Sequence, residues 1–131
     1  MKALDTGVLL ALLEGSVRAR DKLRSLRGEE LATTEANLLE LAYIAAIGPS
    51  KSRTARVAAL ERLRQRLTVL PIDGRSVREA TARVTNGGDK LSPTVSAMFG
   101  ALRAAGCDEL LTGDRRLSGS DWGVRVRVVG V

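Results

Sequence analysis

Short strand-like segments alternate with longer helical patterns along the whole chain, and this alternation is what most restricts its fold. Strands are expected at 2–5, 31–34, 68–70, 110–112 and 124–129. Helices, most of them with a polar cap or a glycine stop, are expected at 6–14, 17–26, 35–47, from 50 or 52 to 67, 74–86 and 93–105. Such alternation with short connections predicts a mostly parallel sheet covered on both faces. We therefore predict a single α/β domain over residues 1–131, with three α/β/α layers.

Three carboxylates far apart in the sequence fall where this fold would gather them. Asp5 follows the first strand, Glu40 lies in the helix after the second, and Asp114 closes the segment after 110–112. The carboxyl ends of parallel strands share one edge of a sheet, and ligands bind there. Acids gathered at that edge repel one another unless a cation neutralises them. Asp5, Glu40 and Asp114 are therefore predicted to form a divalent-metal site.

The helix that carries Glu40 is apolar over most of its surface. Its apolar residues are Leu38, Leu39, Leu41, Ala42, Tyr43, Ile44, Ala45 and Ile47. A helix that is apolar nearly all round is usually buried, so Glu40 is expected to be partly desolvated, as functional acids often are. Each acid also has a plain structural interpretation. Asp5 would cap a helix, Glu40 would be an exposed helical residue, and Asp114 would form a turn.

The residue types that are missing exclude several kinds of site. The chain has no histidine, which excludes Ser-His-Asp and Cys-His catalysis and zinc sites built on imidazole. The single Cys107 cannot form an internal disulfide or a cysteine-rich cluster, and it is expected to be a buried apolar residue. Carboxylates without histidine suit Mg²⁺ or Mn²⁺, which prefer oxygen ligands.

The net charge of +6 comes mainly from arginine, because lysine occurs only at positions 2, 22, 51 and 90. A basic surface around an acidic metal site suits a nuclease, since it attracts phosphates toward carboxylates that would otherwise repel them. The alternative is that these arginines are merely solvated on helix surfaces. With Tyr43, Phe99 and Trp122 as the only aromatic residues, a base-stacking RNA platform is not expected.

Apolar runs in this sequence are short. None approaches the ~18 residues that a membrane-spanning helix needs. The apolar stretch 7–13 is flanked closely by Asp5 and Glu14, which argues against a cleaved signal peptide. A cytoplasmic location is therefore expected.

Three segments resemble the PIN domain, and within it the VapC-type toxins of toxin–antitoxin modules. LDTGVLLALL at 4–13 resembles the family's first strand, acid and helix, and TTEANLLEL at 33–41 resembles its second strand and acid-bearing helix. LLTGD at 110–114 resembles the strand that supplies a further acid. The resemblance spans the whole chain. It implies a Mg²⁺- or Mn²⁺-dependent ribonuclease with Asp5, Glu40 and Asp114 as its acids, an RNA substrate, an antitoxin partner and a homodimer.

The sequence departs from the family's pattern at Val95. The family has a further acid there, whereas Val95, Met98, Phe99 and Leu102 form an apolar stripe typical of a core helix. Losing one carboxylate would weaken metal binding, unless Asp89 or Asp121 compensates. The alternative function is therefore a catalytically impaired PIN-like module that binds RNA or a partner protein.

Overall fold

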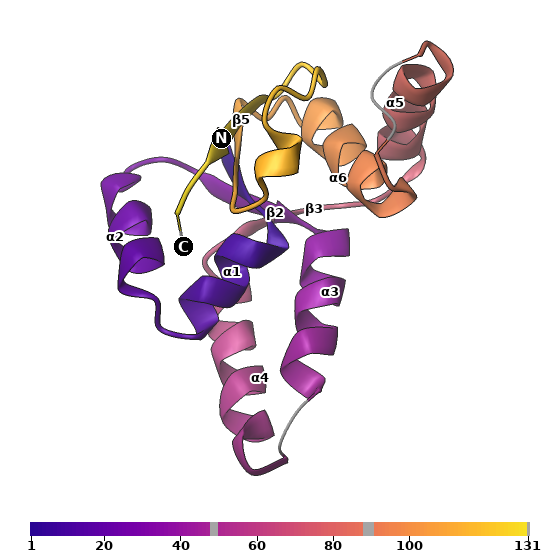
Figure 1. Cartoon of the computed structure of the whole chain (residues 1–131). Coiled ribbons are helices and arrows are strands. Elements are labelled where there is room, and N and C mark those ends of the chain that lie inside the picture. Colours follow the sequence, from indigo (N-terminus) through magenta and orange to yellow (C-terminus); the bar gives the residue numbers. More distant parts are fainter. Residues whose placement is uncertain (48–49, 88–90, 131) are drawn as a thin grey trace.

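The expected order of strands and helices is present in the computed structural model, which describes residues 1–47, 50–87 and 91–130 (Figure 1). The side chains of residues 50 and 51 are not described. In chain order the elements are β1 (Lys2–Leu4), α1 (Thr6–Leu13), α2 (Val17–Ser25), β2 (Leu31–Thr34), α3 (Glu35–Ala46), α4 (Ser50–Arg64), β3 (Thr68–Leu70), α5 (Gly74–Thr85), α6 (Pro93–Ala104), β4 (Glu109–Thr112), a 3₁₀ turn (Arg115–Leu117) and β5 (Arg125–Val128).

The strands form one sheet in the order β3-β2-β1-β4-β5, and every pair of neighbours is parallel. The prediction of a mostly parallel sheet is thus confirmed. The chain moves outward from β1 through β2 to β3 and then crosses to β4 on the other side of β1. The strand order therefore reverses between β1 and β4. In open α/β sheets the ligand crevice lies at this point, outside the carboxyl ends of the strands.

The two faces of the sheet are covered by different helices, which confirms the three layers. Alternate residues of a strand point to opposite faces, so Ala3 and Leu110 pack with Phe99 and Leu102 of α6. On the other face, Leu4 and Leu111 pack in a second cluster with residues of α1, α3 and α4. In Figure 1 the hairpin of α3 and α4 extends away from α5 and α6, which pack closely together.

Polar side chains begin most of the helices, as the sequence predicts. Asp5, Ser16, Thr34, Asp73 and Ser92 each accept a hydrogen bond from a backbone N–H in the first turn. The turns after α1 and α2 contain Gly15 and Gly28 at positive φ, which only glycine adopts without strain. The predicted stop of α3 at Gly48-Pro49 lies outside the described residues.

Helix α3 is not buried on most sides, so this part of the sequence prediction is wrong. Leu41 and Ala45 face the core, whereas Leu39, Tyr43 and Ile47 are 62%, 66% and 70% exposed. A helix that lies on one face of a sheet buries only the side toward it, and nothing in the described chain covers the other side. Glu40 is exposed as well.

Two smaller predictions are confirmed. Cys107 is buried, and β5 is an edge strand in which exposed and half-buried residues alternate. Within the residues that the structure describes, no helix is both long enough and apolar enough to cross a membrane.

Candidate active site

Asp5 lies directly after β1 and begins α1, so it is both a helix cap and a buried carboxylate. One oxygen, Oδ1, accepts a hydrogen bond from the Val8 N–H at 3.2 Å, and Oδ2 accepts one from the Thr112 hydroxyl. The residue is only 9% exposed. Burial raises the pKa of the Asp5 carboxyl, and the two hydrogen bonds oppose that rise only in part.

Thr112 connects Asp5 to Asp114 across the point where the strand order reverses. It is the last residue of β4 and is fully buried. Its hydroxyl donates to the Asp5 carboxylate and accepts a hydrogen bond from the Asp114 N–H at 3.0 Å. A single side chain therefore joins the ends of two adjacent strands and links the Asp5 carboxylate to the backbone of Asp114.

Asp114 is partly exposed, and Arg116 satisfies both of its oxygens. Oδ1 lies 2.9 Å from the Arg116 backbone N and 3.0 Å from its Nε, and Oδ2 lies 3.0 Å from its Nη2. These bonds lower the pKa of the Asp114 carboxyl. The Arg116 side chain is 89% exposed, so solvent screens this pair and the arginine can leave at little cost.

Glu40 does not join the other two acids in the structure. It is the sixth residue of α3, roughly 7.5 Å along the axis from the first residue of the helix. The buried face of α3 carries Asn37, Leu41 and Ala45, and Glu40 lies outside it. Within the described residues, no group of three acidic, histidine or cysteine side chains lies close enough together to hold a metal ion.

Asn37 is the side chain of α3 that faces this edge, and the sequence analysis missed it. Its Nδ2 donates to the Thr6 hydroxyl at 3.1 Å, and its Oδ1 accepts from the Thr34 hydroxyl at 2.7 Å. It is 8% exposed. Its position in the sequence could have indicated this role. In a helix that follows a strand directly, the third residue lies closer to the edge of the sheet than the sixth, which here is Glu40.

Helix α6 contributes apolar side chains to the same region. Met98 Sδ lies 3.5 Å from Asn37 Nδ2, and Val95, one turn earlier, packs against the core as predicted. Of the two aspartates considered as replacements, Asp121 is exposed and forms an ion pair with Arg83 at 2.6 Å. Asp89 lies outside the described residues.

The donor atoms at this edge fit a weakly held divalent ion. Mg²⁺ usually keeps several waters and is bound through one or two carboxylates plus substrate phosphates. Asp5 supplies one carboxylate, and Asp114, whose backbone N–H contacts the same Thr112 hydroxyl, lies near enough for its charge to raise the pKa of Asp5. Among the described residues no third carboxylate lies close enough to form a group of three with them, so the ion would depend on water and substrate to complete its coordination.

The fold and the acidic edge define the class of protein. The sequence model of the PIN domain family matches residues 2–122, and the chain belongs to that family. The comparison with curated proteins gave no match.

Several solved structures share the fold. VapBC2 from Rickettsia felis, bound to a DNA fragment from its promoter, has a TM-score of 0.82 at 14% identity, with 98% of each chain covered. FitAcB from Neisseria gonorrhoeae has a TM-score of 0.80 at 20% identity, with 96% of each chain covered. VapC20 from Mycobacterium tuberculosis, a toxin that cleaves the sarcin-ricin loop, has a TM-score of 0.65 at 20% identity and covers 95% of this chain and 99% of its own.

Proposed function

We propose that this chain is a ribonuclease of the toxin–antitoxin type, which cleaves RNA with Mg²⁺ or Mn²⁺ held by Asp5 and Asp114. The observation that carries the proposal is the single buried hydroxyl of Thr112, which contacts the Asp5 carboxylate and the Asp114 backbone where the strand order reverses. The negative charge of Asp114 contributes to the raised pKa of Asp5, so the two carboxylates repel each other, and a cation would relieve that repulsion.

The residues of the site have separate tasks in this proposal. When bound, the ion would polarise the scissile phosphate and lower the pKa of a water molecule. Val8 and Thr112 hold the Asp5 carboxylate in a fixed orientation. Arg116 neutralises Asp114 in the free protein and, because it is exposed, can transfer to an incoming phosphate and free that carboxylate.

Glu40 stays in the proposal with the role first predicted for it, which is either to complete the site or to orient the water. Its exposure restricts it to the solvent side of α3. The substitution Glu40→Gln keeps the shape of the side chain and removes its charge. A role in catalysis predicts a loss of cleavage of about tenfold or more. An unchanged rate would remove Glu40 from the site.

An antitoxin protein is the proposed partner, because the structural relatives include toxin–antitoxin complexes. A homodimer is proposed through the exposed apolar stripe of α3, formed by Leu39, Tyr43 and Ile47. These residues are four apart and so lie on one side of the helix, where a second copy of the same stripe can pack in a two-fold interface. The RNA substrate implies a cytoplasmic location.

A second function is favoured by a separate observation. Asn37 on α3 and Val95 on α6 put an amide and an apolar side chain on the two helices beside Asp5. A PIN-like module without a carboxylate at either of these two positions would bind RNA or a partner protein without cleaving RNA. Rate measurements with a divalent ion distinguish this alternative from the ribonuclease.

The test is cleavage of a fluorophore–quencher RNA with MgCl₂, with MnCl₂ and with EDTA. Asp5→Asn keeps the helix cap and removes the charge, so we expect a rate loss of about 100-fold or more. Asp108→Asn is the matched control, since Asp108 is an exposed carboxylate that pairs with the Met1 amine just before β4. Equal cleavage by all three proteins would refute the ribonuclease. Absence of metal-dependent cleavage by the natural chain would favour the binding module.

A further inference from the structure

A hollow between the two packed helices α5 and α6 has the size and lining of a small-molecule site. Its volume is about 400 Å³, within the range of about 300–1,000 Å³ that such sites span. Buried Ala80 and Ser96 and half-buried Ala97 form its floor, while exposed Val77 and Val84 form part of its rim. The described lining therefore offers mainly apolar surface to a ligand.

The hollow follows from where the two helices touch and from the small side chains beyond that contact. At the contact, a Cβ added to Gly100 would lie 2.2 Å from the Ser76 carbonyl oxygen and 3.0 Å from the Ala80 Cβ. One turn nearer the start of α6, Ser96 and Ala97 are also small, and the described side chains around them leave the space open. The close approach of the helices thus closes one end of the hollow.

The hydroxyl of Ser96 is a separate observation that points to a ligand. Ser96 is 5% exposed, and its hydroxyl oxygen is buried without a hydrogen-bond partner among the described residues. Helical hydroxyls often bond back to the preceding turn, as Thr85 does to the Thr81 carbonyl at 2.8 Å. An unpartnered buried hydroxyl is unfavourable, so a ligand oxygen that accepts its hydrogen would bind favourably. The oxygen is covered in the free protein, and a rotation about the single χ1 torsion of serine would turn it toward the hollow.

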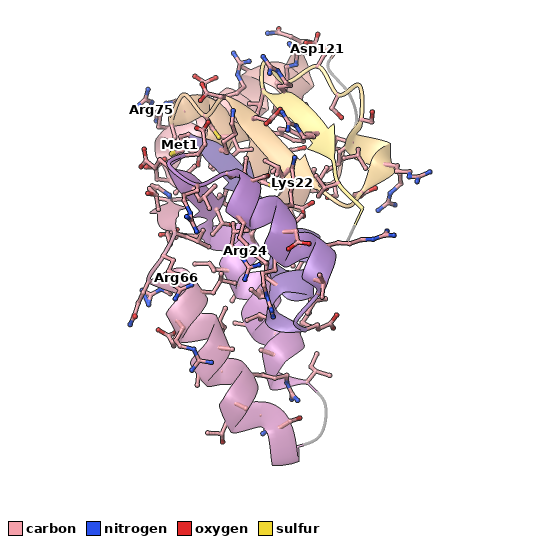
Figure 2. All side chains as sticks on the ribbon, turned by 90° about the vertical axis from the view of Figure 1, so that its left-hand side faces the viewer. Met1, Lys22, Arg24, Arg66, Arg75 and Asp121 are labelled. Carbon is pink, nitrogen blue, oxygen red and sulfur yellow. The ribbon has the colours of Figure 1, made fainter. Side chains whose placement is uncertain are left out.

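The charge of the lining restricts the ligand further. Charged side chains extend from much of the surface, and Figure 2 shows Arg75 of α5 among them. The described lining of the hollow contains none, so an ion would lose its water there without gaining a counter-charge. The volume equals that of about a dozen water molecules, which fits an uncharged ligand of about ten non-hydrogen atoms.

We infer that this hollow binds an uncharged, largely apolar small molecule with one oxygen that accepts a hydrogen bond from Ser96. The inference goes beyond the proposed ribonuclease and does not depend on it. Binding is measured without RNA or a divalent ion, so failure of the hollow and failure of the ribonuclease give different results.

The probes are indanone and indane, two compact bicyclic molecules that differ by a single carbonyl oxygen. Nuclear magnetic resonance of the backbone amides of the full chain measures both dissociation constants and locates the residues that respond. We expect indanone to bind with a dissociation constant below about 1 mM, to shift mainly amides of α5 and α6, and to bind about fivefold more tightly than indane. A dissociation constant above about 1 mM, or shifts centred on other elements, would overturn the inference.

A filled hollow should not accept the probe. Ala97→Leu adds a larger side chain to the floor, and Ala82→Leu is the matched control, because Ala82 is an exposed residue of α5 outside the lining. We expect indanone binding to weaken by about tenfold in the first variant and by less than about twofold in the second. Circular dichroism verifies that both variants are folded. Equal affinities in the two variants would place the ligand elsewhere and overturn the inference.

Ser96→Ala tests the hydroxyl while keeping the space. Indanone should lose its advantage over indane, and the variant should melt at the same or a higher temperature than the natural chain, because a buried hydroxyl without a partner is removed. A melting temperature lowered by more than about 5 °C would mean that the hydroxyl already has a partner in the protein, and the inference would be wrong.

A second copy of the chain is the alternative occupant, because Val77 and Val84 on the rim are 48% and 47% exposed. Light scattering distinguishes the two. Val84→Asp should keep the oligomeric state of the natural chain. If this substitution converts a dimer into a monomer, a second copy covers the hollow and the inference is wrong.

Discussion

Replacing Thr112 by valine should destabilise the protein more than the same change at any other buried threonine of the sheet. Valine has the same shape, so the substitution removes the hydroxyl and keeps the packing. Two hydrogen bonds are lost, the one donated to the Asp5 carboxylate and the one accepted from the Asp114 N–H. A hydrogen bond to a charged group is worth about 1.5–3 kcal/mol and a neutral one about 1 kcal/mol. The expected loss is therefore about 2.5–4 kcal/mol.

Thr33→Val is the matched control. Thr33 is also a buried strand residue, only 1% exposed, and its hydroxyl donates one hydrogen bond of 2.9 Å to the Leu4 carbonyl. Loss of this neutral bond should lower the free energy of unfolding by about 1 kcal/mol. Because the exchange of hydroxyl for methyl is the same at both sites, the difference between the variants isolates the contacts with Asp5 and Asp114.

The difference between the two variants should also depend on pH. The Thr112 hydrogen bond lowers the pKa of Asp5, so its loss raises that pKa further. The bond matters most while Asp5 is ionised, and its contribution shrinks as pH falls through the raised pKa. Urea unfolding in a series of buffers from about pH 8 down to below the ordinary aspartate pKa measures this directly. Equal losses for both variants, or a difference that does not shrink toward the low end of the series, would refute the reasoning.

Three other predictions concern the packing of α6 and the metal site. Gly100→Ala should lower the free energy of unfolding by at least about 2 kcal/mol, because the added Cβ would lie 2.2 Å from the Ser76 carbonyl oxygen. Gly7→Ala is the control. Its added Cβ would have its nearest neighbour at 3.6 Å, so this variant should melt at the same or a higher temperature. Val95→Asp should lower the Mn²⁺ concentration for half-maximal cleavage by about tenfold, and an unchanged concentration would place position 95 outside the site. The affinity for Mn²⁺, measured by calorimetry, should weaken as pH falls through the raised pKa of Asp5. If the affinity instead falls by half at the ordinary aspartate pKa, the raised pKa of Asp5 is contradicted.

The sequence predicts the fold well because most elements carry their own start signal. Asp73 and Ser92 accept hydrogen bonds at the first turns of α5 and α6, as their positions indicate. The parallel sheet follows from the helical crossovers between strands. The exposure of one side of α3 could not be predicted from the sequence. A leucine or isoleucine that faces the sheet and one that faces a surface open to a partner give the same apolar pattern.

The two acids that follow strands were the easier part of the site to predict. Asp5 and Asp114 come directly after β1 and β4, and the register of those adjacent strands brings their ends together. Glu40 was predicted from its charge within an apolar helix and from the resemblance of 33–41 to the family's acid-bearing helix. In the structure it is exposed and lies outside the buried face of α3 that carries Asn37. Asn37 has no charge, so its part in this edge, where it bonds to Thr6 and Thr34, does not follow from the pattern of acids.

The choice of asparagine at position 37 has a physical consequence for the whole site. Its amide donates to Thr6, the neighbour of Asp5, and lies 3.5 Å from the sulfur of Met98 on α6. A carboxylate there would be desolvated beside buried Asp5 and would require a cation, whereas the amide satisfies its neighbours without one. A bound ion stabilises the folded protein by an amount that grows with the ratio of the ion concentration to its dissociation constant. A weakly held ion therefore adds little to the free energy of unfolding. The hydrogen bonds of Asn37 and Thr112 therefore hold this edge together, and the metal would be needed for chemistry rather than for structure.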